Sequence, residues 1–242
     1  IEAIIDNREN VDSKLVKEIE KNNIKIYKGY TVVNTFGYKK INKISIMQLS
    51  KDGQKVVGSK ISIDCDCLGM SGGWTPAVHL FTQSGGKLKF RDDDQVFIPD
   101  TYPSDQISIG SCNGEFTLDE ILSSISKKLK DFLNIKKTEY ENLEIQSHFN
   151  KTKRNIWLLP SDKIIGKTKP FVDYQNDATA KDIKLALREG FRSIEHVKRY
   201  TTTGMGTDQG KLGNMHALGI ISETAGSKMG AVSYTHLRAH ET

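Results

Sequence analysis

The amino-acid sequence predicts an α/β fold that is followed by a small module of helices. Three observations support this fold class. The first 63 residues alternate strand-like and helix-like apolar patterns, residues 106–125 join a strand to a helix through a glycine-rich turn, and residues 171–211 form a helical hairpin pattern. The first two patterns are typical of α/β units that bind nucleotides, so we expect two structural parts with different roles.

The N-terminal pattern has the order strand, helix, strand and then a small meander. We expect a strand at 1–6, a helix at 11–21, strands at 24–27, 30–36, 41–49 and 55–63, and a buried strand at 61–68. This order resembles the second half of a nucleotide-binding α/β unit, in which an acidic residue after a strand often binds a ribose hydroxyl. Asp6 has this position, but no glycine-rich turn precedes it in the sequence. We therefore favour a structural role for Asp6.

The second pattern is the segment QISIGSCNG at 106–114. It reads as a strand that ends in a turn between two glycines, and Leu118, Ile121, Leu122 and Ile125 then mark a helix. A turn of this kind directs backbone N–H groups and the positive end of the helix dipole toward a bound anion. A plain loop explains the same residues nearly as well, and both interpretations stay open.

The third pattern, at 171–211, has signals for two short helices. Thr179 is placed as an N-cap, and Asp182 three residues later completes a capping box. Gly190 interrupts the pattern, Ser193 can cap the second helix, and Gly204 is placed to end it in the left-handed conformation. The apolar face comprises Ile183, Ala186, Leu187, Phe191, Ile194 and Val197.

Cations and hydroxyls gather at the end of this second helix. Lys198 and Arg199 precede three threonines at 201–203, and the segment GTDQGK at 206–211 adds a flexible backbone and one more cation. Backbone N–H groups, a hydroxyl and a cation are what a phosphate site requires. A solvated basic helix end is the competing interpretation.

Composition limits the class of protein. The chain has 242 residues, of which 37% are hydrophobic and 27% charged, and this balance is typical of a soluble globular protein. The net charge of +5 comes from dispersed lysines that are not interleaved with aromatic residues, which argues against nucleic acid as a partner. The sequence has neither an apolar run of membrane-spanning length nor a signal peptide, so it predicts no membrane partner.

The cysteines predict a reducing, cytoplasmic location. There are three of them, and an odd, sparse set does not build a disulfide framework. Cys65 and Cys67 would share one face of the expected strand at 61–68, where a buried apolar role is favoured. A metal site would need two further ligands, and the surrounding sequence suggests none. His79 lies in an apolar context, and a core role is favoured for it as well.

The amino-acid sequences of two segments resemble those of a known family. The run from Phe171 to Lys211 resembles the alpha subunit of heterotetrameric sarcosine oxidase, in which an FVDFQND-type strand leads into REGFRS, EH, KRYTT, GM and TDQGK. The segment SGGWTPAVHLFTQSGGKLKF, which begins at Ser71, is similar to the same subunit at the crossover of its two-dinucleotide-binding-domain flavoprotein fold. The resemblance covers almost all of residues 1–223.

The 171–213 segment also resembles the small iron–sulfur domain of bacterioferritin-associated ferredoxin. That pattern has C-x-C before the first helix and C-Q-G-x-x-C after the second. This chain has Asp173, Gln175, Asp208 and Gly213 at those positions. Iron–sulfur clusters need thiolate or occasionally histidine ligands, so the resemblance implies a scaffold that has lost its cluster, with no metal bound.

The resemblance implies a domain order. Residues 1–125 would be a partial, N-terminally truncated dinucleotide-binding domain of the pyridine nucleotide-disulfide oxidoreductase type, 126–170 a connector, and 171–223 the degenerate ferredoxin-like helical module. The C-terminal VSYTHLRAHET resembles the in-frame translation of a sequencing adapter, so we expect 231–242 to be a foreign tail.

The resemblance also implies a function. The complete complex would oxidatively demethylate sarcosine to glycine and formaldehyde and form hydrogen peroxide. Its alpha subunit would bind NAD, share FMN with the beta subunit and assemble with beta, gamma and delta subunits, while FAD and folate would lie in other parts of the complex.

On this interpretation no catalytic residue lies in this chain, and the fragment would not be active alone. The NAD contacts carried over from the family are Gly110, Ser111 and Phe116. For the FMN wall we select Lys198, Arg199, Thr201, Thr202, Gln209 and Lys211, because clustered cations, hydroxyls and flexible backbone suit a phosphate and a flavin ring. Two alternatives stay open: a non-catalytic dinucleotide-binding scaffold, and the alpha subunit of another amine, opine or proline dehydrogenase.

Overall fold

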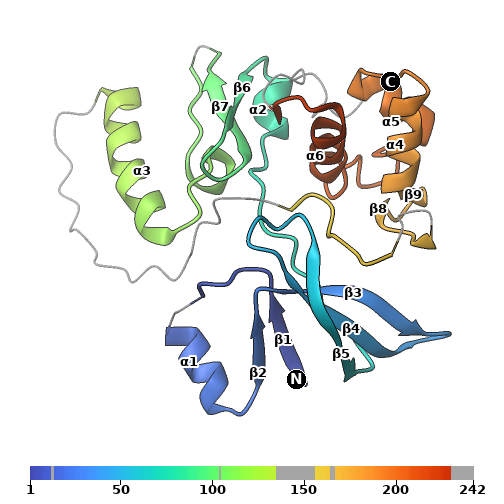
Figure 1. Ribbon diagram of the computed structural model, residues 1–242. Coiled ribbons are helices and arrows are strands. Elements are labelled where there is room, and N and C mark those ends of the chain that lie inside the picture. Colours follow the sequence, from blue (N-terminus) through green and yellow to red (C-terminus); the bar gives the residue numbers. More distant parts are fainter. Residues whose placement is uncertain (12–13, 104, 135–155, 164–166, 230–242) are drawn as a thin grey trace. The chain divides into compact units, whose positions relative to one another are not determined.

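The computed structural model describes residues 1–11, 14–103, 105–134, 156–163 and 167–229 (Figure 1). The chain divides into two compact units. The first combines residues 1–72 with 156–170, and the second combines 73–155 with 171–242. The predicted foreign tail lies outside the described residues. The predicted domain boundaries at 125 and 170 stay predictions.

The first unit begins with a parallel strand pair. β1 (Ala3–Asp6) pairs with β2 (Lys25–Lys28), and α1 (Lys14–Lys21) connects them, because parallel neighbours need a crossover. The predicted order of strand, helix and strand is confirmed. The Asp6 carboxylate accepts hydrogen bonds from the backbone N–H of Arg8 at 2.9 Å and from its guanidinium at 2.7 Å. Burial raises the pKa of Asp6, but the hydrogen bonds from Arg8 outweigh it and hold the pKa below its usual value.

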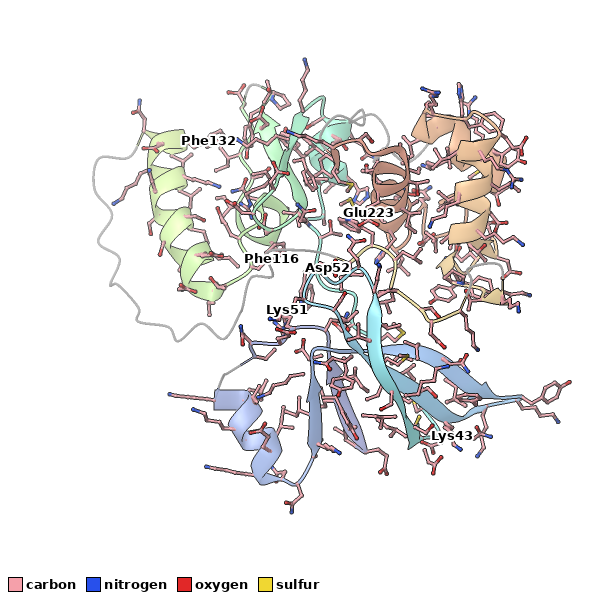
Figure 2. All side chains as sticks on the ribbon, viewed as in Figure 1. Lys43, Lys51, Asp52, Phe116, Phe132 and Glu223 are labelled. Atoms are coloured by element: carbon pink, nitrogen blue, oxygen red, sulfur yellow. The ribbon has the colours of Figure 1, made fainter. Side chains whose placement is uncertain are left out.

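An antiparallel sheet completes the first unit. It has the order β3 (Tyr30–Gly37), β4 (Ile41–Leu49) and β5 (Val56–Asp64), which confirms the predicted meander. Ile44 and Ile46 of the central strand are buried. Lys43, labelled in Figure 2, lies 3.8 Å from the Asp64 carboxylate where the β4–β5 pairing ends.

The prediction of a buried strand at 61–68 is wrong. β5 ends at Asp64, and most of its residues are exposed, because it is the edge strand of this sheet. Residues 65–78 have no regular secondary structure. As a consequence Cys65 is only half-buried and Cys67 is exposed, so the predicted buried pair does not form.

The second unit starts with a short helix and a hairpin. α2 (His79–Gln83) precedes β6 (Lys87–Arg91) and β7 (Val96–Thr101), and the rings of Phe90 and Phe97 meet edge to face at 5.0 Å across the pair. The predicted strand at 106–109 does not form, since the strand that precedes the turn is β7. The 3₁₀ helix η1 (Gly110–Asn113) then leads to α3 (Leu118–Leu133).

The C-terminal part of the second unit is helical. A minimal pair of strands, β8 (Phe171–Asp173) and β9 (Ala178–Thr179), leads to α4 (Ala180–Arg188) and α5 (Ile194–Thr201), and α6 (Asn214–Ala225) follows after a long connection. α4 contacts both α5 and α6, and Figure 1 shows these helices grouped together in orange to red. The large aliphatic side chains that are fully buried in this core include Ile183, Ile194, Val197, Ile220 and Ile221.

The helix ends in this module match most of the predicted signals. The capping box at Thr179 is confirmed: its hydroxyl accepts from the Asp182 N–H at 3.4 Å, and the Asp182 carboxylate accepts from the Thr179 N–H at 2.9 Å. Ser193 is the N-cap of α5 but makes no side-chain capping bond. Thr202, with a φ of 58°, ends α5, although Gly204 two residues later is also left-handed. No helix in the described part of the chain combines the length and apolar character that a membrane span requires.

Candidate functional site

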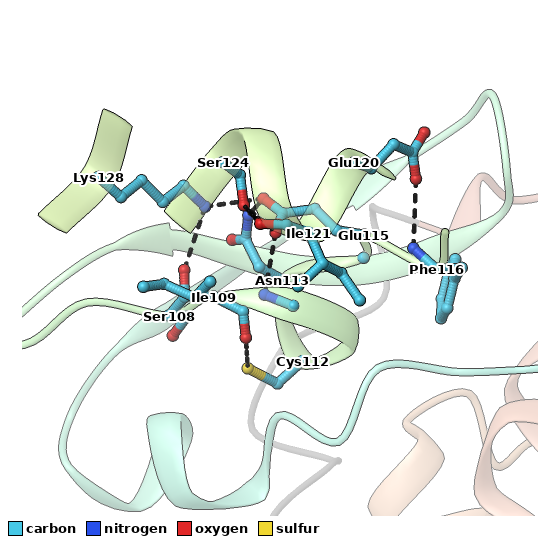
Figure 3. Close-up of polar contacts among 12 residues, drawn as sticks. Ser108, Ile109, Cys112, Asn113, Glu115, Phe116, Glu120, Ile121, Ser124 and Lys128 are labelled. Carbon is cyan, nitrogen blue, oxygen red and sulfur yellow. Dashed lines mark hydrogen bonds and ion pairs between the residues drawn. The ribbon is translucent and has the colours of Figure 1, made fainter. Parts of the chain in front are cut away.

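The turn that begins at Gly110 is organised around the carboxylate of Glu115 (Figure 3). Gly110, at a φ of 81°, donates its backbone N–H to this carboxylate at 2.9 Å. The Asn113 amide donates at 2.8 Å, the Ser124 hydroxyl at 2.5 Å and the Lys128 ammonium at 3.0 Å. One half-buried anion therefore collects donors from the turn and from two positions on α3.

This arrangement keeps Glu115 ionised. Burial raises its pKa, but the hydrogen bonds from Ser124 and Lys128, with those from Gly110 and Asn113, outweigh burial and leave the pKa below its usual value. A side chain of the protein thus occupies the place at this turn that a ligand anion would need in order to reach the Gly110 N–H.

The other two predicted NAD contacts lie in the same turn. Phe116 is half-buried, and its backbone N–H donates to Glu120 at 3.3 Å, beside the capping box that Thr117 and Glu120 form at the start of α3. Ser111 is exposed, and its carbonyl accepts from the Gly114 N–H at 3.1 Å. The structure brings Gly110, Ser111 and Phe116 together, and their contact with NAD stays a prediction.

The loops around α5 are held by polar side chains. Asp173 is only 6% exposed, and its carboxylate accepts from the backbone N–H of Gly204 at 2.7 Å, of Gln175 at 2.9 Å and of Asn176 at 3.2 Å. The Gln175 side-chain carbonyl accepts from the Thr207 N–H at 2.6 Å. These bonds connect β8 to the segment that follows α5.

Asp208 and Gly213 also serve the packing of this segment. Asp208 accepts from the backbone N–H of Gly210 at 3.2 Å and of Leu212 at 3.3 Å. A Cβ atom at Gly213 would lie 2.8 Å from the Val172 carbonyl oxygen, so a larger side chain does not fit there. All four positions that correspond to the cysteines of the ferredoxin pattern are thus engaged in internal bonds or close packing. Among the described residues, no three or more histidine, cysteine or acidic side chains are grouped so that they could hold a metal ion.

Lys198 is one of the six residues predicted for the FMN wall. Its side chain is buried, so it is not a solvated cation at the helix end. It is 2% exposed on the inner face of α5. Burial lowers its pKa, and the negative charge of Glu195 offsets part of this effect. A lysine in this position contributes to the interior of the module and is not presented to a ligand at the surface.

The other five residues lie at the end of α5 and on the segment that follows. Arg199, Thr202, Gln209 and Lys211 are exposed, whereas Thr201 donates its hydroxyl to the Val197 carbonyl at 2.7 Å. Thr202 and Gln209 have φ values of 58° and 51°, a left-handed conformation that non-glycine residues adopt at an energetic cost. The structure therefore exposes two cations, Arg199 and Lys211, a few residues from these left-handed positions, and their role in binding stays a prediction.

A pocket at the start of α6 was missed by the sequence reasoning. It is a small hollow that is partly open to solvent. It is lined by Thr75, Pro76, Val78, His79, Phe97, Gly210, Lys211, Asn214 and Met215. His79 is half-buried here, and burial and then the charge of Lys211 lower its pKa. No local pattern could have revealed this pocket, because its walls come from segments more than a hundred residues apart.

Comparisons with known proteins agree with the resemblance in the sequence. Residues 167–240 match the family model described as the sarcosine oxidase A3 domain. The sarcosine oxidase subunit alpha of Corynebacterium sp. (strain P-1) is 28% identical over 232 residues, which are 93% of this chain and 24% of that protein. The subunit alpha of Rhizobium meliloti (strain 1021) is 32% identical over 196 residues, which are 76% of this chain and 19% of that protein. This chain therefore spans about a quarter or less of the length of these relatives.

The structural comparison concerns the fold. The crystal structure of L-proline dehydrogenase from P. horikoshii matches 99% of this chain and 48% of that protein with a TM-score of 0.61 at 17% sequence identity. At this identity the match shows the fold alone, and it confirms the predicted α/β fold class. The predicted resemblance is confirmed too: the chain is similar to part of a sarcosine oxidase alpha subunit, and its residues 167–240 match the model of the A3 domain of that family.

Proposed function

We propose that this chain is part of the alpha subunit of a sarcosine oxidase-type complex, an oxidoreductase that acts on CH–NH groups. The observation that carries the proposal is the A3 match at 167–240, which includes the whole α4–α5–α6 module. The complete complex would convert sarcosine to glycine and formaldehyde with formation of hydrogen peroxide. Beta, gamma and delta subunits would be its partners in the cytoplasm.

In this proposal the chain binds cofactors and does not itself oxidise the amine. The flavins, when bound, would supply the electron transfer from amine to dioxygen, and FAD and folate would lie elsewhere in the complex. The exposed cations Arg199 and Lys211 suit the phosphate of FMN, and the left-handed backbone at Thr202 and Gln209 allows close approach of a ligand. The half-buried hydroxyl of Thr201 and the interior cation of Lys198 would support this wall from behind.

The NAD contribution is assigned to the turn at Gly110. Ser111 offers an exposed hydroxyl at this turn, and Phe116 offers a half-buried ring. The N–H of Gly110 already donates to Glu115, so Gly110 would contribute through its backbone conformation. A dinucleotide phosphate would then meet the exposed side of the turn, with the Glu115 carboxylate behind it.

The test is FMN retention in a reconstituted complex that contains the complete alpha subunit. We expect Arg199→Ala with Lys211→Ala to lower the flavin content per complex, because both variants remove charge that faces a phosphate. Lys181→Ala, an exposed lysine on α4, is the matched control. Unchanged FMN content in the double variant would overturn the assignment of the wall. A comparison of the turnover rates with sarcosine, proline and other secondary amines tests the substrate. NAD that is bound stoichiometrically and is not reduced by any of these amines would favour the alternative of a non-catalytic scaffold.

A further inference from the structure

Three sulfur-containing side chains follow one another closely in the sequence just after β5 ends. Cys65 and Cys67 are separated by one residue, and Met70 comes three residues later. This stretch has no regular secondary structure, and the chain bends at Asp66 between the two cysteines. All of it belongs to the first compact unit. We call residues 65–70 the sulfur segment.

The sulfur groups of this segment are accessible from solution. Cys67 is exposed, Cys65 is half-buried, and neither thiol forms a disulfide. Met70 is 70% exposed, so its polarizable thioether does not serve the packing of the core. Three soft ligand atoms are therefore offered to solvent within six residues of chain.

One end of the sulfur segment is fixed, and the other end has room to move. The Cys65 backbone N–H donates to the Asn42 carbonyl at 3.2 Å, just beyond the end of the β4–β5 pairing. By contrast, a Cβ atom at Gly69 would have no heavy atom within 4 Å. Because open space surrounds Gly69, the chain can bring Met70 toward the two thiols at little cost in packing.

The charges beside the thiols favour a cation as the ligand. Asp64 and Asp66 flank Cys65 on both sides, and both are exposed. Lys43 lies 3.8 Å from the Asp64 carboxylate and neutralises only part of this negative charge. Deprotonation of the thiols would add more negative charge, which a bound metal cation compensates.

The kind of ligand atom selects among the metal cations. Thiolate and thioether sulfur are soft ligands that favour Cu(I). A zinc site usually takes four ligands, and the described residues around this segment supply no group of three histidine, cysteine or acidic side chains for a metal. Cu(I) is commonly held by two or three ligands, so the two cysteines and Met70 are sufficient for it. The shortage of ligands that argues against zinc therefore does not argue against Cu(I).

We propose that Cys65, Cys67 and Met70 form a binding site for Cu(I). The two thiols lose their protons to solvent and form two copper–thiolate bonds, and the thioether of Met70 completes the coordination. The ion stays in the Cu(I) state, so binding requires neither an oxidant nor a reductant. The site lies in the first unit and uses none of the residues assigned to NAD or FMN, so it goes beyond the proposed function.

The test uses the full 242-residue chain without oxygen, with Cu(I) as the probe. Bathocuproine disulfonate forms a coloured complex with Cu(I), so the loss of its absorbance measures the copper that the chain removes from it. We expect one Cu(I) per chain and weaker binding as the pH falls, because protons compete for the thiolates. Excess Zn²⁺ should not displace the copper.

Three cysteine variants separate a shared site from the binding of copper by single thiols. Cys65→Ser and Cys67→Ser should each weaken Cu(I) binding at least about 100-fold, because the second thiolate binds as an intramolecular ligand at high effective concentration. Cys112→Ser is the matched control and should leave the affinity unchanged. Cys112 belongs to the second unit, where its thiol donates to the Ile109 carbonyl at 3.2 Å.

Met70→Leu tests the third ligand at a similar side-chain volume. It should weaken Cu(I) binding measurably, but less than either Cys65→Ser or Cys67→Ser. These three variants change accessible side chains outside regular secondary structure, so their circular dichroism spectra should match that of the parent chain.

Several outcomes would overturn the proposal. Full binding by Cys65→Ser or by Cys67→Ser would exclude a shared site, and an equal loss in Cys112→Ser would show that copper binds to thiols in general. Unchanged affinity in Met70→Leu would contradict coordination by three sulfur atoms. A dimer that forms only after copper is added, measured by light scattering, would show that the ion bridges two chains. None of these outcomes depends on the cofactors of the proposed function.

Discussion

The Asp173 carboxylate accepts a hydrogen bond from the backbone N–H of Gly204 at 2.7 Å, across 31 residues of chain. This bond connects β8 to the segment after α5, which carries Thr202, Gln209 and Lys211, three of the six residues proposed to bind FMN. Asp173 stands where the ferredoxin pattern has a cysteine ligand. In this chain the Asp173 carboxylate accepts hydrogen bonds from backbone N–H groups at this position. The stability of the module should therefore depend on Asp173.

Replacement of Asp173 by Ala should lower the free energy of unfolding by about 2–4 kcal/mol, because the buried N–H of Gly204 and the part-buried N–H groups of Gln175 and Asn176 lose a charged acceptor. Urea unfolding followed by circular dichroism measures the change. Glu189→Ala, at the exposed C-cap of α4, is the control and should stay within about 0.5 kcal/mol of the parent chain. An Asp173→Ala chain as stable as this control would show that the bonds are not needed.

Acidification should weaken the same connection. Burial raises the pKa of Asp173, but the hydrogen bonds from Gly204, Asn176 and Gln175 outweigh it and hold the pKa below its ordinary value of 3.8. A carboxylate with a lowered pKa stabilises the fold fully above its unfolded pKa, and this stability is lost as the pH falls through the folded value. The unfolding free energy should thus decline below about pH 4, and Asp173→Asn should decline less over the same range.

The Glu115 network should contribute to the stability of the turn before α3. Glu115→Ala leaves four donors without their acceptor and should cost about 2–3 kcal/mol. Lys128→Met removes one partly exposed partner and should cost about 1 kcal/mol or less. Thermal or urea unfolding of both variants gives the comparison. Equal effects would contradict a network that is centred on the carboxylate.

Two glycines of the module should differ sharply in their tolerance of alanine. Gly210→Ala meets the Asn214 amide as well as an unfavourable φ of 75°, whereas Gly190→Ala, at a φ of 97°, has open space around its Cβ. We expect Gly190→Ala to cost about 1–2 kcal/mol from its left-handed conformation alone and Gly210→Ala to cost clearly more. Similar unfolding free energies for the two variants would argue against the tight slot around Asn214.

The two helix starts give a second matched pair. Thr179→Ala should cost about 1 kcal/mol, since the Thr179 hydroxyl takes part in a complete capping box. Ser193→Ala should be nearly neutral, because the Ser193 side chain makes no capping bond. The unfolding free energies of the two variants measured side by side decide the point. A larger loss at Ser193 than at Thr179 would contradict this description of the caps.

The sequence by itself determined the features that depend on neighbouring residues. The capping box at Thr179, the two helices of the hairpin, the antiparallel meander and the crossover at α1 all follow from caps, turns and apolar periodicity over short distances. The resemblance to a family could also be recognised, because long runs of residues are similar in sequence to sarcosine oxidase alpha subunits.

Only the tertiary structure decided which groups are buried and which meet. α6 is apolar on nearly all sides, so its weak periodicity concealed a helix that becomes part of the core. The burial of Lys198, the gathering of four donors by Glu115 and the pocket at Asn214 arise from contacts between segments that are distant in the sequence. Such contacts depend on how whole elements pack, and this information is not contained in the pattern of any single stretch.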